Sequence, residues 1–322
     1  VSVVPEFTDR VTDHIKKSGG TDVVHANYWL SGIAGHSIKH DLDVPLVNTF
    51  HTFARVKAAG GDPESALRER AETEIIGCSD AICVSCTEEE RQFTELYGNP
   101  PGKIEIVSPG VEHAFFAPGD RRGARTALGL GDGPVLLFVG RIQPLKGVDV
   151  AVQTLAELSD PRAILLVVGG ASGSEGDTEM DRVQALVESL GLRGRVRFVD
   201  PQPHHILSTY YRAADVVLVP SRSESFGLVA LEAAACGTPV VASAVGGLLT
   251  IVEHGRTGFL VPDRDPSVFA AHTGRILSDG RVARDMSRAA ATKARGYTWA
   301  FAAARLRRVY ADLAARDRVV CR

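Results

Sequence analysis

Residues 223–247 read SESFGLVALEAAACGTPVVASAVGG, a polar loop followed by a helix-forming run and an apolar strand. Ala, Leu and Glu favour a helix over residues 228–235. Gly237 is expected at the position just after the helix, and Pro239 prevents the helix from continuing. The Val-Val-Ala run at 240–242 predicts a short buried strand. A helix that leads into a buried strand is typical of α/β folds with parallel sheets.

The same stretch has one carboxylate on each side of a helix N-terminus. Glu224 lies in the loop and Glu232 on the second turn of the helix. Free N–H groups and the positive end of the helix dipole attract anions at such a terminus. Two carboxylates with amides between them suit a polyhydroxylated ligand that carries phosphate; the alternative is that both are solvated surface residues. The residues between the two carboxylates that we expect at this site are Phe226, Gly227, Leu228 and Val229.

Outside this stretch, strands alternate with helices in two series, separated by a turn-rich segment at 109–120. This alternation predicts an α/β protein with two doubly wound, Rossmann-like domains, at residues 1–118 and 119–298, that face each other across a cleft. A terminal helix within 299–322 is expected to pack back toward the first domain. The expected strands are 22–26, 45–49, 81–84 and 104–107, then 135–139, 163–168, 196–199, 216–219 and 240–242.

The first expected helix covers residues 7–19. Its apolar positions Phe7, Val11 and Ile15 are four residues apart, which predicts one buried stripe.

Composition narrows the class of protein. The chain has 322 residues, 44% hydrophobic and 23% charged, with a net charge of −3. This balance is that of a globular protein and gives no reason to expect a nucleic-acid partner held by bulk charge. No apolar run approaches the roughly 20 residues that span a bilayer, and no secretory signal is recognised. We therefore expect a cytoplasmic protein without a membrane span.

The five cysteines are odd in number and have no framework spacing. We expect the Cys83–Cys86 pair, despite its CxxC spacing, to be small buried residues without a zinc or redox role. The acidic pairs Asp41–Asp43 and Asp263–Asp265 mimic a metal-binding Asp-x-Asp motif, but both fall in turns away from the expected strand ends. No metal site is predicted.

A second motif follows the strand at 135–139. The loop GRIQPLKG begins at Gly140 and carries Arg141 and Lys146, which could neutralise a diphosphate, one as a bidentate fork and the other as a point charge. A solvated basic loop is the alternative. The later sequence Gly169-Gly170 does not open directly into a helix, so a dinucleotide site of the GxGxxG type is not expected.

Both motifs resemble those of the family 4 retaining glycosyltransferases, which have the two-domain GT-B fold. The resemblance implies that Glu224 holds hydroxyls of the donor sugar, that Glu232 holds the nucleotide ribose, and that the Gly227 and Leu228 amides meet the diphosphate. It also implies that Arg141 and Lys146 stabilise the departing diphosphate, while the region of Gln202 packs on the base. The donor would be a UDP-sugar, with no further cofactor required. The catalytic set is then Arg141, Lys146 and Glu224, and the donor-binding set Gly140, Gln202, Phe226, Gly227, Leu228, Val229 and Glu232.

The first half of the chain resembles one subgroup, the inositol 3-phosphate glycosyltransferases of mycothiol synthesis, in HxxYWLSG from residue 25 and TFHTFARVK from residue 49. In that subgroup the residues matching Tyr28, Thr52 and Arg68 hold the acceptor phosphate, and His51 is a further polar candidate. Two hydroxyls and a guanidinium suit a phosphate. Sucrose-phosphate synthases share much of HANYWLSG, so a transferase of that kind is an alternative.

Two hypotheses lie outside this activity. A UDP-sugar 2-epimerase shares the fold but would lack the GRxxPxKG loop. A nucleotide-binding, inactive paralogue is the second, because the family's opening strand and glycine-rich loop are expected ahead of Val1. The family's Pro-Glu after the Gly246-Gly247 pair is also replaced here by Leu249-Thr250. A homodimer stays open.

Overall fold

The computed structural model describes residues 1–173 and 176–321. The chain forms two compact units, one of residues 1–109 with 299–322 and the other of residues 110–298. The segment 110–118, which was expected in the first domain, belongs to the second unit because it is held on helix α9 (His204–Ala213): Arg212 Nε donates to the Ala117 carbonyl at 2.9 Å, and the Phe116 ring packs against Tyr211.

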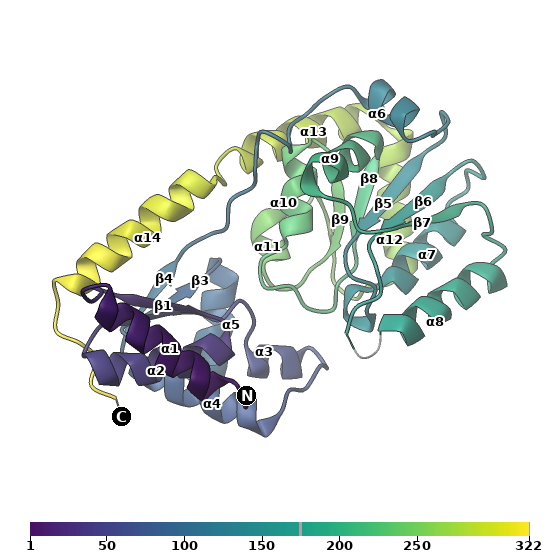
Figure 1. Ribbon diagram of the computed structural model, residues 1–322. Coiled ribbons are helices and arrows are strands. Elements are labelled where there is room, and N and C mark those ends of the chain that lie inside the picture. The colour runs from purple at the N-terminus through teal and green to yellow at the C-terminus, as the bar shows by residue number, and fades with distance from the viewer. Residues whose placement is uncertain (174–175, 322) are drawn as a thin grey trace. The chain divides into compact units, whose positions relative to one another are not determined.

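A four-stranded parallel sheet forms the centre of the first unit (Figure 1). Its strands follow one another in chain order, and all residues of the third are buried. Apolar runs of this kind, with little alternation, are typical of parallel strands covered on both faces. The strands are β1 (Val24–Asn27), β2 (Leu46–Thr49), β3 (Ala81–Val84) and β4 (Lys103–Ile106).

Helices cover both faces of this sheet. Ile82 and Val84 of β3 pack into a cluster with Phe53 and Phe93, whereas Ala81 and Cys83 pack against Val309 and Leu313 of the last helix. Alternate residues of a strand point to opposite faces, so the last helix lies on the face away from the aromatic cluster. The helices are α1 (Val4–Lys17), α2 (Trp29–Leu42), α3 (Ala54–Ala59), α4 (Ala66–Cys78), α5 (Thr87–Tyr97) and α14 (Trp299–Ala314).

The prediction that Phe7, Val11 and Ile15 form the buried side of the first helix is wrong. Phe7 is 52% exposed, and the buried positions of α1 are Val4, Thr8 and Thr12. This row has the same four-residue spacing but lies one position further along the helix. Small threonines allow α1 to approach its neighbour closely, and the Thr8 hydroxyl is satisfied by donating to the Val4 carbonyl at 2.8 Å.

Cys83 and Cys86 are buried, as expected, but the sequence did not predict a disulfide. Cys78, at the end of α4, forms a disulfide with Cys321, 243 residues later. The C-terminal segment returns to the first unit, where the Val319 N–H donates to Asp80 Oδ1 at 2.6 Å and Lys39 Nζ donates to the Val319 carbonyl at 3.0 Å. The terminal helix was expected near the first domain, but sequence spacing carries no sign of the disulfide and the hydrogen bonds that fasten the segment after it.

The second unit contains a six-stranded parallel sheet in the order β10-β9-β8-β5-β6-β7. The chain begins in the middle at β5, runs outward to β7, and then returns to the other side of β5. Ligands bind in such sheets beyond the carboxyl ends of the strands at this reversal point. The strands are β5 (Val135–Val139), β6 (Ile164–Val168), β7 (Val196–Val199), β8 (Val216–Val219), β9 (Val240–Ser243) and β10 (Gly258–Val261), the last of which was not predicted.

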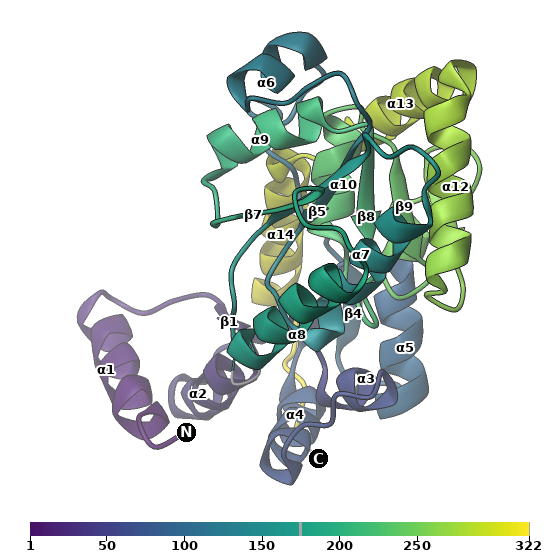
Figure 2. The same ribbon diagram turned by 90° about the vertical axis from the view of Figure 1, so that its right-hand side faces the viewer.

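Helices lie on both faces of this second sheet (Figure 1; Figure 2). Helix α7 (Val148–Glu157) contacts α8 (Gly176–Ser189) and α12 (Pro266–Ser278), and α10 (Leu228–Ala235) contacts α9 and α13 (Gly280–Ala294). The remaining elements are α6 (Arg121–Ala127), the short 3-10 helix η1 (Pro144–Lys146) and α11 (Leu248–Ile251). Within the described residues, no helix is long and apolar enough to cross a membrane.

Candidate active site

Two predicted motif loops come together at the reversal point of the second sheet. One follows β5 and carries Lys146; the other follows β8 and carries Glu224. The Arg222 N–H donates to the Leu145 carbonyl at 2.9 Å, which joins the two loops through their backbones. Lys146 Nζ then lies 2.7 Å from Glu224 Oε2, and each of these side chains is 20% exposed. A cation and a carboxylate are thus held together at the strand ends.

Two glycines, Gly246 and Gly247, lie directly against the backbone of the Glu224 loop. The Gly247 N–H donates to the Glu224 carbonyl at 2.9 Å. A Cβ added at Gly246, whose φ is +49°, would lie 1.9 Å from that same carbonyl oxygen, and one at Gly247 would lie 2.3 Å from Phe226 Cα. Backbones can approach this closely only where no side chain is present. The glycine pair therefore fixes the loop, although the Pro-Glu of the related motif is absent.

The start of α10 has a glycine and an exposed apolar residue next to its free N–H groups. Gly227, with φ of +97°, precedes the helix, and the Phe226 side chain is 4% exposed because it packs against Tyr297. Leu228 is 45% exposed, and Val229 is half-buried. The first N–H groups of any helix lack an acceptor within the helix, and they carry the positive end of its dipole. This terminus follows directly on the loop of Glu224.

Glu232 lies one turn into α10 and is half-buried. Its Oε2 accepts a hydrogen bond from the Tyr211 hydroxyl at 2.7 Å. Burial raises the pKa of the Glu232 carboxyl above its usual value, with the Tyr211 bond acting in the opposite direction. Burial also raises the pKa of the Tyr211 hydroxyl well above its ordinary range, so Tyr211 is a donor at all ordinary pH values. Tyr211 thus orients the carboxylate and occupies one of its oxygens.

Three other predicted donor residues lie at strand ends of the same sheet. Gly140 directly follows β5, and a Cβ on Gly169 would lie 1.8 Å from the Gly140 carbonyl oxygen, so these two loops also touch. The Arg141 side chain is exposed, and the described part of the chain gives it no ion pair. Gln202 lies after β7, where its Nε2 donates to the Asp200 carbonyl at 2.9 Å. Arg141 is therefore a cation available to a ligand.

The predicted acceptor residues gather within the first unit. Arg68 Nη2 donates to the carbonyl and the hydroxyl of Thr52 at 2.8 and 3.0 Å. The same guanidinium lies 5.2 Å from the centre of the Tyr28 ring, and its Nη1 is 3.5 Å from the Tyr28 hydroxyl. One buried cation thus organises two hydroxyl-bearing residues from two different strand ends.

Arg68 is not a free cation in this arrangement. Its side chain is 2% exposed, and it pairs with Glu72 at 2.7 Å and with Glu64 at 2.8 Å. The role of Glu64 was not predicted, although residues four apart on a helix, or just before one, lie within reach of each other. A phosphate would have to replace one of the oxygens that the Arg68 N–H groups already contact. Phosphate binding by Arg68 therefore stays a prediction.

The residues after β1 and β2 have an unusual backbone. Tyr28 and His51 have φ of +74° and +62°, a region that residues other than glycine rarely occupy. Such strain is often found at functional sites. His51 Nε2 lies 2.9 Å from Asn27 Oδ1, and burial lowers the pKa of His51. The His51 imidazole is therefore neutral near pH 7 and linked to the end of β1.

The GRIQPLKG loop and the SESFGLVALEA stretch lie in residues 120–293, which match the family model described as "Glycosyl transferases group 1". Residues 3–110 match "Glycosyl transferase 4-like domain". The chain belongs to the group 1 glycosyltransferases. The expectations of this family, of the two-domain α/β fold and of a glycosyltransferase class of enzyme are thereby confirmed.

Similar proteins agree with this family. This glycosyltransferase is 45% identical over 315 residues to the D-inositol 3-phosphate glycosyltransferase of Acidothermus cellulolyticus, covering 94% of the chain and 70% of the relative. It is 46% identical over 292 residues to the enzyme of that name from Mycobacterium tuberculosis strain F11, covering 88% of the chain and 60% of the relative. The chain thus spans less than two thirds of the length of the mycobacterial relative.

Two solved structures show the same fold. A sucrose-phosphate synthase from Thermosynechococcus elongatus is 33% identical, with a TM-score of 0.89 over 97% of this chain and 78% of its own. Anabaena HepE, solved in complex with UDP and glucose, is 21% identical, with a TM-score of 0.86 over 97% of this chain and 82% of its own.

The site of this glycosyltransferase is thus assembled within each unit separately. The second unit brings together Lys146, Glu224 and the start of α10, and the first brings together Tyr28, Thr52 and Arg68. Arg141, Gln202 and His51 lie at the same sheet ends, and within the described residues their side chains make no hydrogen bond or ion pair with these groups. The residues that sequence reasoning missed are the supporting ones, Glu64, Tyr211 and Arg222, whose neighbours are distant in the chain or whose spacing alone is weak evidence.

Proposed function

We propose that this protein is a retaining glycosyltransferase that moves a sugar, N-acetylglucosamine or glucose, from UDP to a small phosphorylated acceptor such as inositol 3-phosphate. The observation that carries the proposal is the Lys146–Glu224 pair, 2.7 Å apart at the reversal point of the second sheet and next to the start of α10. The names of the 45–46% identical relatives support the acceptor.

The donor diphosphate would accept hydrogen bonds from the first amides of α10. Lys146 and Arg141 would neutralise the negative charge that grows on the diphosphate as the bond to the sugar breaks. Preorganised cations at such a position act mainly on the transition state. Because Lys146 is already paired with Glu224, the cation is held in place before the donor arrives.

The two carboxylates would bind the sugar and the ribose of the donor. Glu224 would accept hydrogen bonds from sugar hydroxyls, and Glu232 from the ribose hydroxyls. The Tyr211 bond engages Oε2 of Glu232, so Oε1 is the oxygen we assign to the ribose. On the acceptor side, Tyr28 and Thr52 would bind the phosphate through their hydroxyls, with Arg68 holding both residues in position and His51 as a further polar contact.

A sucrose-phosphate-synthase-like activity is the second candidate, supported by the 33% identity and TM-score of 0.89 to that enzyme. Its acceptor would be a hexose phosphate. The two acceptors share the phosphate and differ in the ring, so the choice depends on residues around the hydroxyl that receives the sugar.

The test is release of UDP from UDP-N-acetylglucosamine and from UDP-glucose, each with inositol 3-phosphate, with a hexose phosphate and with unphosphorylated inositol. We expect release only with a phosphorylated acceptor, and an NMR spectrum of the product that has the anomeric configuration of the donor. An inverted product would contradict the retaining mechanism. Calorimetric binding of UDP without turnover with any acceptor would identify the inactive nucleotide-binding alternative.

Three further parts of the proposal have simple tests. We propose that transfer needs no cofactor besides the donor, so added Mg²⁺ or Mn²⁺ should leave the rate unchanged. A cytoplasmic location is also proposed, in which the Cys78–Cys321 disulfide would be reduced; fractionation of the source cells would test it. The proposal also includes a homodimer, which sedimentation of the chain at several concentrations would test.

A further inference from the structure

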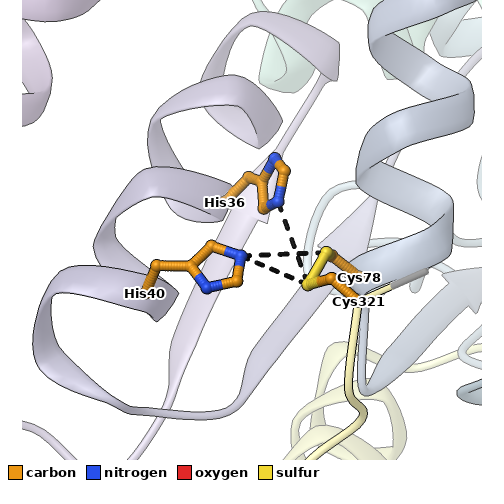
Figure 3. Close-up of side chains that lie close together, drawn as sticks. All are labelled: His36, His40, Cys78 and Cys321. Carbon is orange, nitrogen blue, oxygen red and sulfur yellow. Dashed lines mark hydrogen bonds between the residues drawn. A yellow bond between two sulfur atoms is a disulfide. The ribbon is translucent and has the colours of Figure 1, made fainter.

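Four side chains of the first unit that the proposed activity does not use lie against one another: His36 and His40 on α2, Cys78 at the end of α4, and Cys321 in the C-terminal segment (Figure 3). Their possible ligand atoms all lie within 4.8 Å of one another. The two histidines are one helical turn apart and therefore point from the same face of α2. The four residues come from three separate parts of the chain, so no motif scan would combine them.

The group has the composition of a zinc site. Zn²⁺ prefers imidazole nitrogen and thiolate sulfur in a tetrahedral arrangement, and two Cys with two His is a common structural set. Bond lengths of about 2.0–2.3 Å place neighbouring ligand atoms of a tetrahedron roughly 3.3–3.8 Å apart. His40 Nε2 lies 3.2 Å from Cys321 Sγ and 3.8 Å from Cys78 Sγ, and His36 Nε2 lies 4.0 Å from Cys321 Sγ. These three separations are close to tetrahedral ones, whereas the two sulfurs, which are bonded to each other in this structure, would have to move apart to roughly 3.8 Å.

Two charged groups, Lys39 and Asp80, hold the backbone next to the two cysteines. Lys39 Nζ, buried between the two histidine positions, donates to the Cys78 carbonyl at 2.7 Å and pairs with Asp80 at 2.8 Å. Asp80 accepts the Val319 N–H at 2.6 Å, two residues before Cys321. Partners that fix the backbone of metal ligands are typical of metal sites. The C-terminal segment is thus positioned by contacts that do not depend on the sulfurs.

We propose that the reduced chain binds one Zn²⁺ ion through His36, His40, Cys78 and Cys321. The structure has the oxidised form, in which Cys78 and Cys321 share a disulfide. A dithiol reductant would supply two electrons and two protons to this disulfide and become a disulfide itself. The two thiols would then lose their protons as the thiolates bind the metal. The metal and the disulfide are alternative ways to fasten the C-terminal segment to α2 and α4.

The proposed site has a structural role distinct from transfer. Helix α2 begins directly after Tyr28, and α4 carries Arg68, so both helices that meet at the four ligands also carry acceptor-side residues. Fastening them together stabilises the first unit. A disulfide alone would do the same without any need for histidines, and the two histidines are therefore the feature that separates a metal site from a simple cross-link.

The experiment is metal binding by the full chain under anaerobic conditions, after reduction with a phosphine and removal of the reductant. Thiol counting first establishes that Cys78 and Cys321 are reduced. Titration with Zn²⁺ should then give one tightly bound ion per chain. Co²⁺ in its place should give the visible bands of a tetrahedral ion together with thiolate-to-cobalt charge transfer. Zinc should also raise the thermal unfolding temperature of the reduced chain.

Matched variants identify the ligands. His40→Gln and Cys321→Ser should each weaken zinc binding by about 100-fold or more, since even changes to partners of metal ligands cost about 10–100-fold. His14→Gln, an exposed position on α1, and Cys86→Ser, at a helix N-cap position that suits Ser, should bind zinc as the unchanged chain does. A reduced chain that takes up no stoichiometric zinc would overturn the proposal, and so would equal binding by His40→Gln. Neither result bears on the transfer activity.

Discussion

The ion pair of Lys146 and Glu224 matters more for the proposed reaction than for the stability of the fold. Each side chain is 20% exposed, and the cost of taking two charges partly out of water offsets much of the attraction in their ion pair at 2.7 Å. Its value in the proposed reaction is preorganisation, because the cation is positioned where charge would develop on the leaving diphosphate.

Replacing Lys146 with Ala should therefore lower kcat by about 100-fold and change KM little. Arg222→Ala is the matched control, because Arg222 is an exposed cation on the adjoining loop. Steady-state kinetics of UDP release would measure both. A similar loss in both variants would mean that Lys146 acts only through the general positive charge of the loops.

Glu232 allows a separate test of nucleotide binding. Glu232→Gln removes the charge of the acceptor but not its shape, and a hydrogen bond to a charged group is worth about 1.5–3 kcal/mol. We expect UDP affinity by calorimetry to fall by about 10–150-fold. Tyr211→Phe removes the hydroxyl that orients the carboxylate, and should cost less. If the two variants bind UDP equally weakly, the Glu232 carboxylate supports UDP binding by its hydrogen bond with Tyr211 and not by a hydrogen bond to the ribose.

At the scale of single residues, local spacing predicted the motif positions but not their partners. Lys146 and Glu224 could be assigned to one site because each follows a strand in a recognisable loop. The environment of Arg68 could not be read in this way. Its burial and its pairing with Glu64 and Glu72 depend on how α4 packs beneath the ends of β1 and β2, which spacing does not determine.

At the scale of elements, the Gly246–Gly247 turn decides where the Glu224 loop lies. Gly247→Ala would bring a Cβ to 2.3 Å from the Phe226 backbone, so the two loops must separate. We expect UDP affinity to fall at least tenfold and the chain to lose about 1–3 kcal/mol of stability. Gly274→Ala, in α12 with open space around the added Cβ, is the control, and should leave affinity unchanged. Unaltered UDP binding by Gly247→Ala would show that the close approach is not needed.

The elements that sequence predicted well are those with continuous apolar runs. Strands β3, β5 and β8 are such runs and are buried throughout or nearly so. Strand β10 was missed because Gly258 opens the run and Pro262 follows directly after it, and glycine and proline at the two ends of a short run are typical of a loop. The prediction of which face of α1 is buried was wrong because Thr8 and Thr12 pack inward in place of Phe7. Thr8 donates to a carbonyl of its own helix, whereas the buried Thr12 hydroxyl has no hydrogen-bond partner among the described residues, and a hydrophobic pattern detects neither.

At the scale of the whole chain, the two alternating series predicted both units, but the return of the C-terminal segment was only partly foreseen. Helix α14 was expected near the first domain. The ties that fasten residues 299–322 there could not be predicted, since each joins positions more than 200 residues apart: Cys78 with Cys321, Lys39 with Val319, and His25 with Tyr310.

The last of these ties makes the stability of the first unit depend on pH. His25 Nδ1 lies 2.6 Å from the Tyr310 hydroxyl on α14, and Nε2 lies 2.8 Å from Thr49 Oγ1 on β2. Burial, with a further contribution from His51, lowers the pKa of His25 from 6.5 to about 4. The unfolded chain therefore binds a proton at this residue over a pH range in which the folded chain does not. By linkage, the stability of the first unit should fall as the pH decreases from about 6.5 to about 4, and should not change through His25 above that range.

His25→Gln retains a donor and an acceptor but cannot titrate. We expect this variant to lose about 2 kcal/mol less stability than the unchanged chain between pH 6.5 and pH 4, after allowance for solvent screening. Both tryptophans, Trp29 and Trp299, lie in the first unit, so tryptophan fluorescence during urea unfolding reports on that unit. His14→Gln, at an exposed position, should keep the pH dependence of the unchanged chain. Carboxylates contribute their own acid sensitivity to every variant, and the difference between the His25→Gln and His14→Gln curves isolates His25. If the stability of these two variants changes with pH in the same way, the pKa of His25 is not lowered by folding and the prediction is wrong.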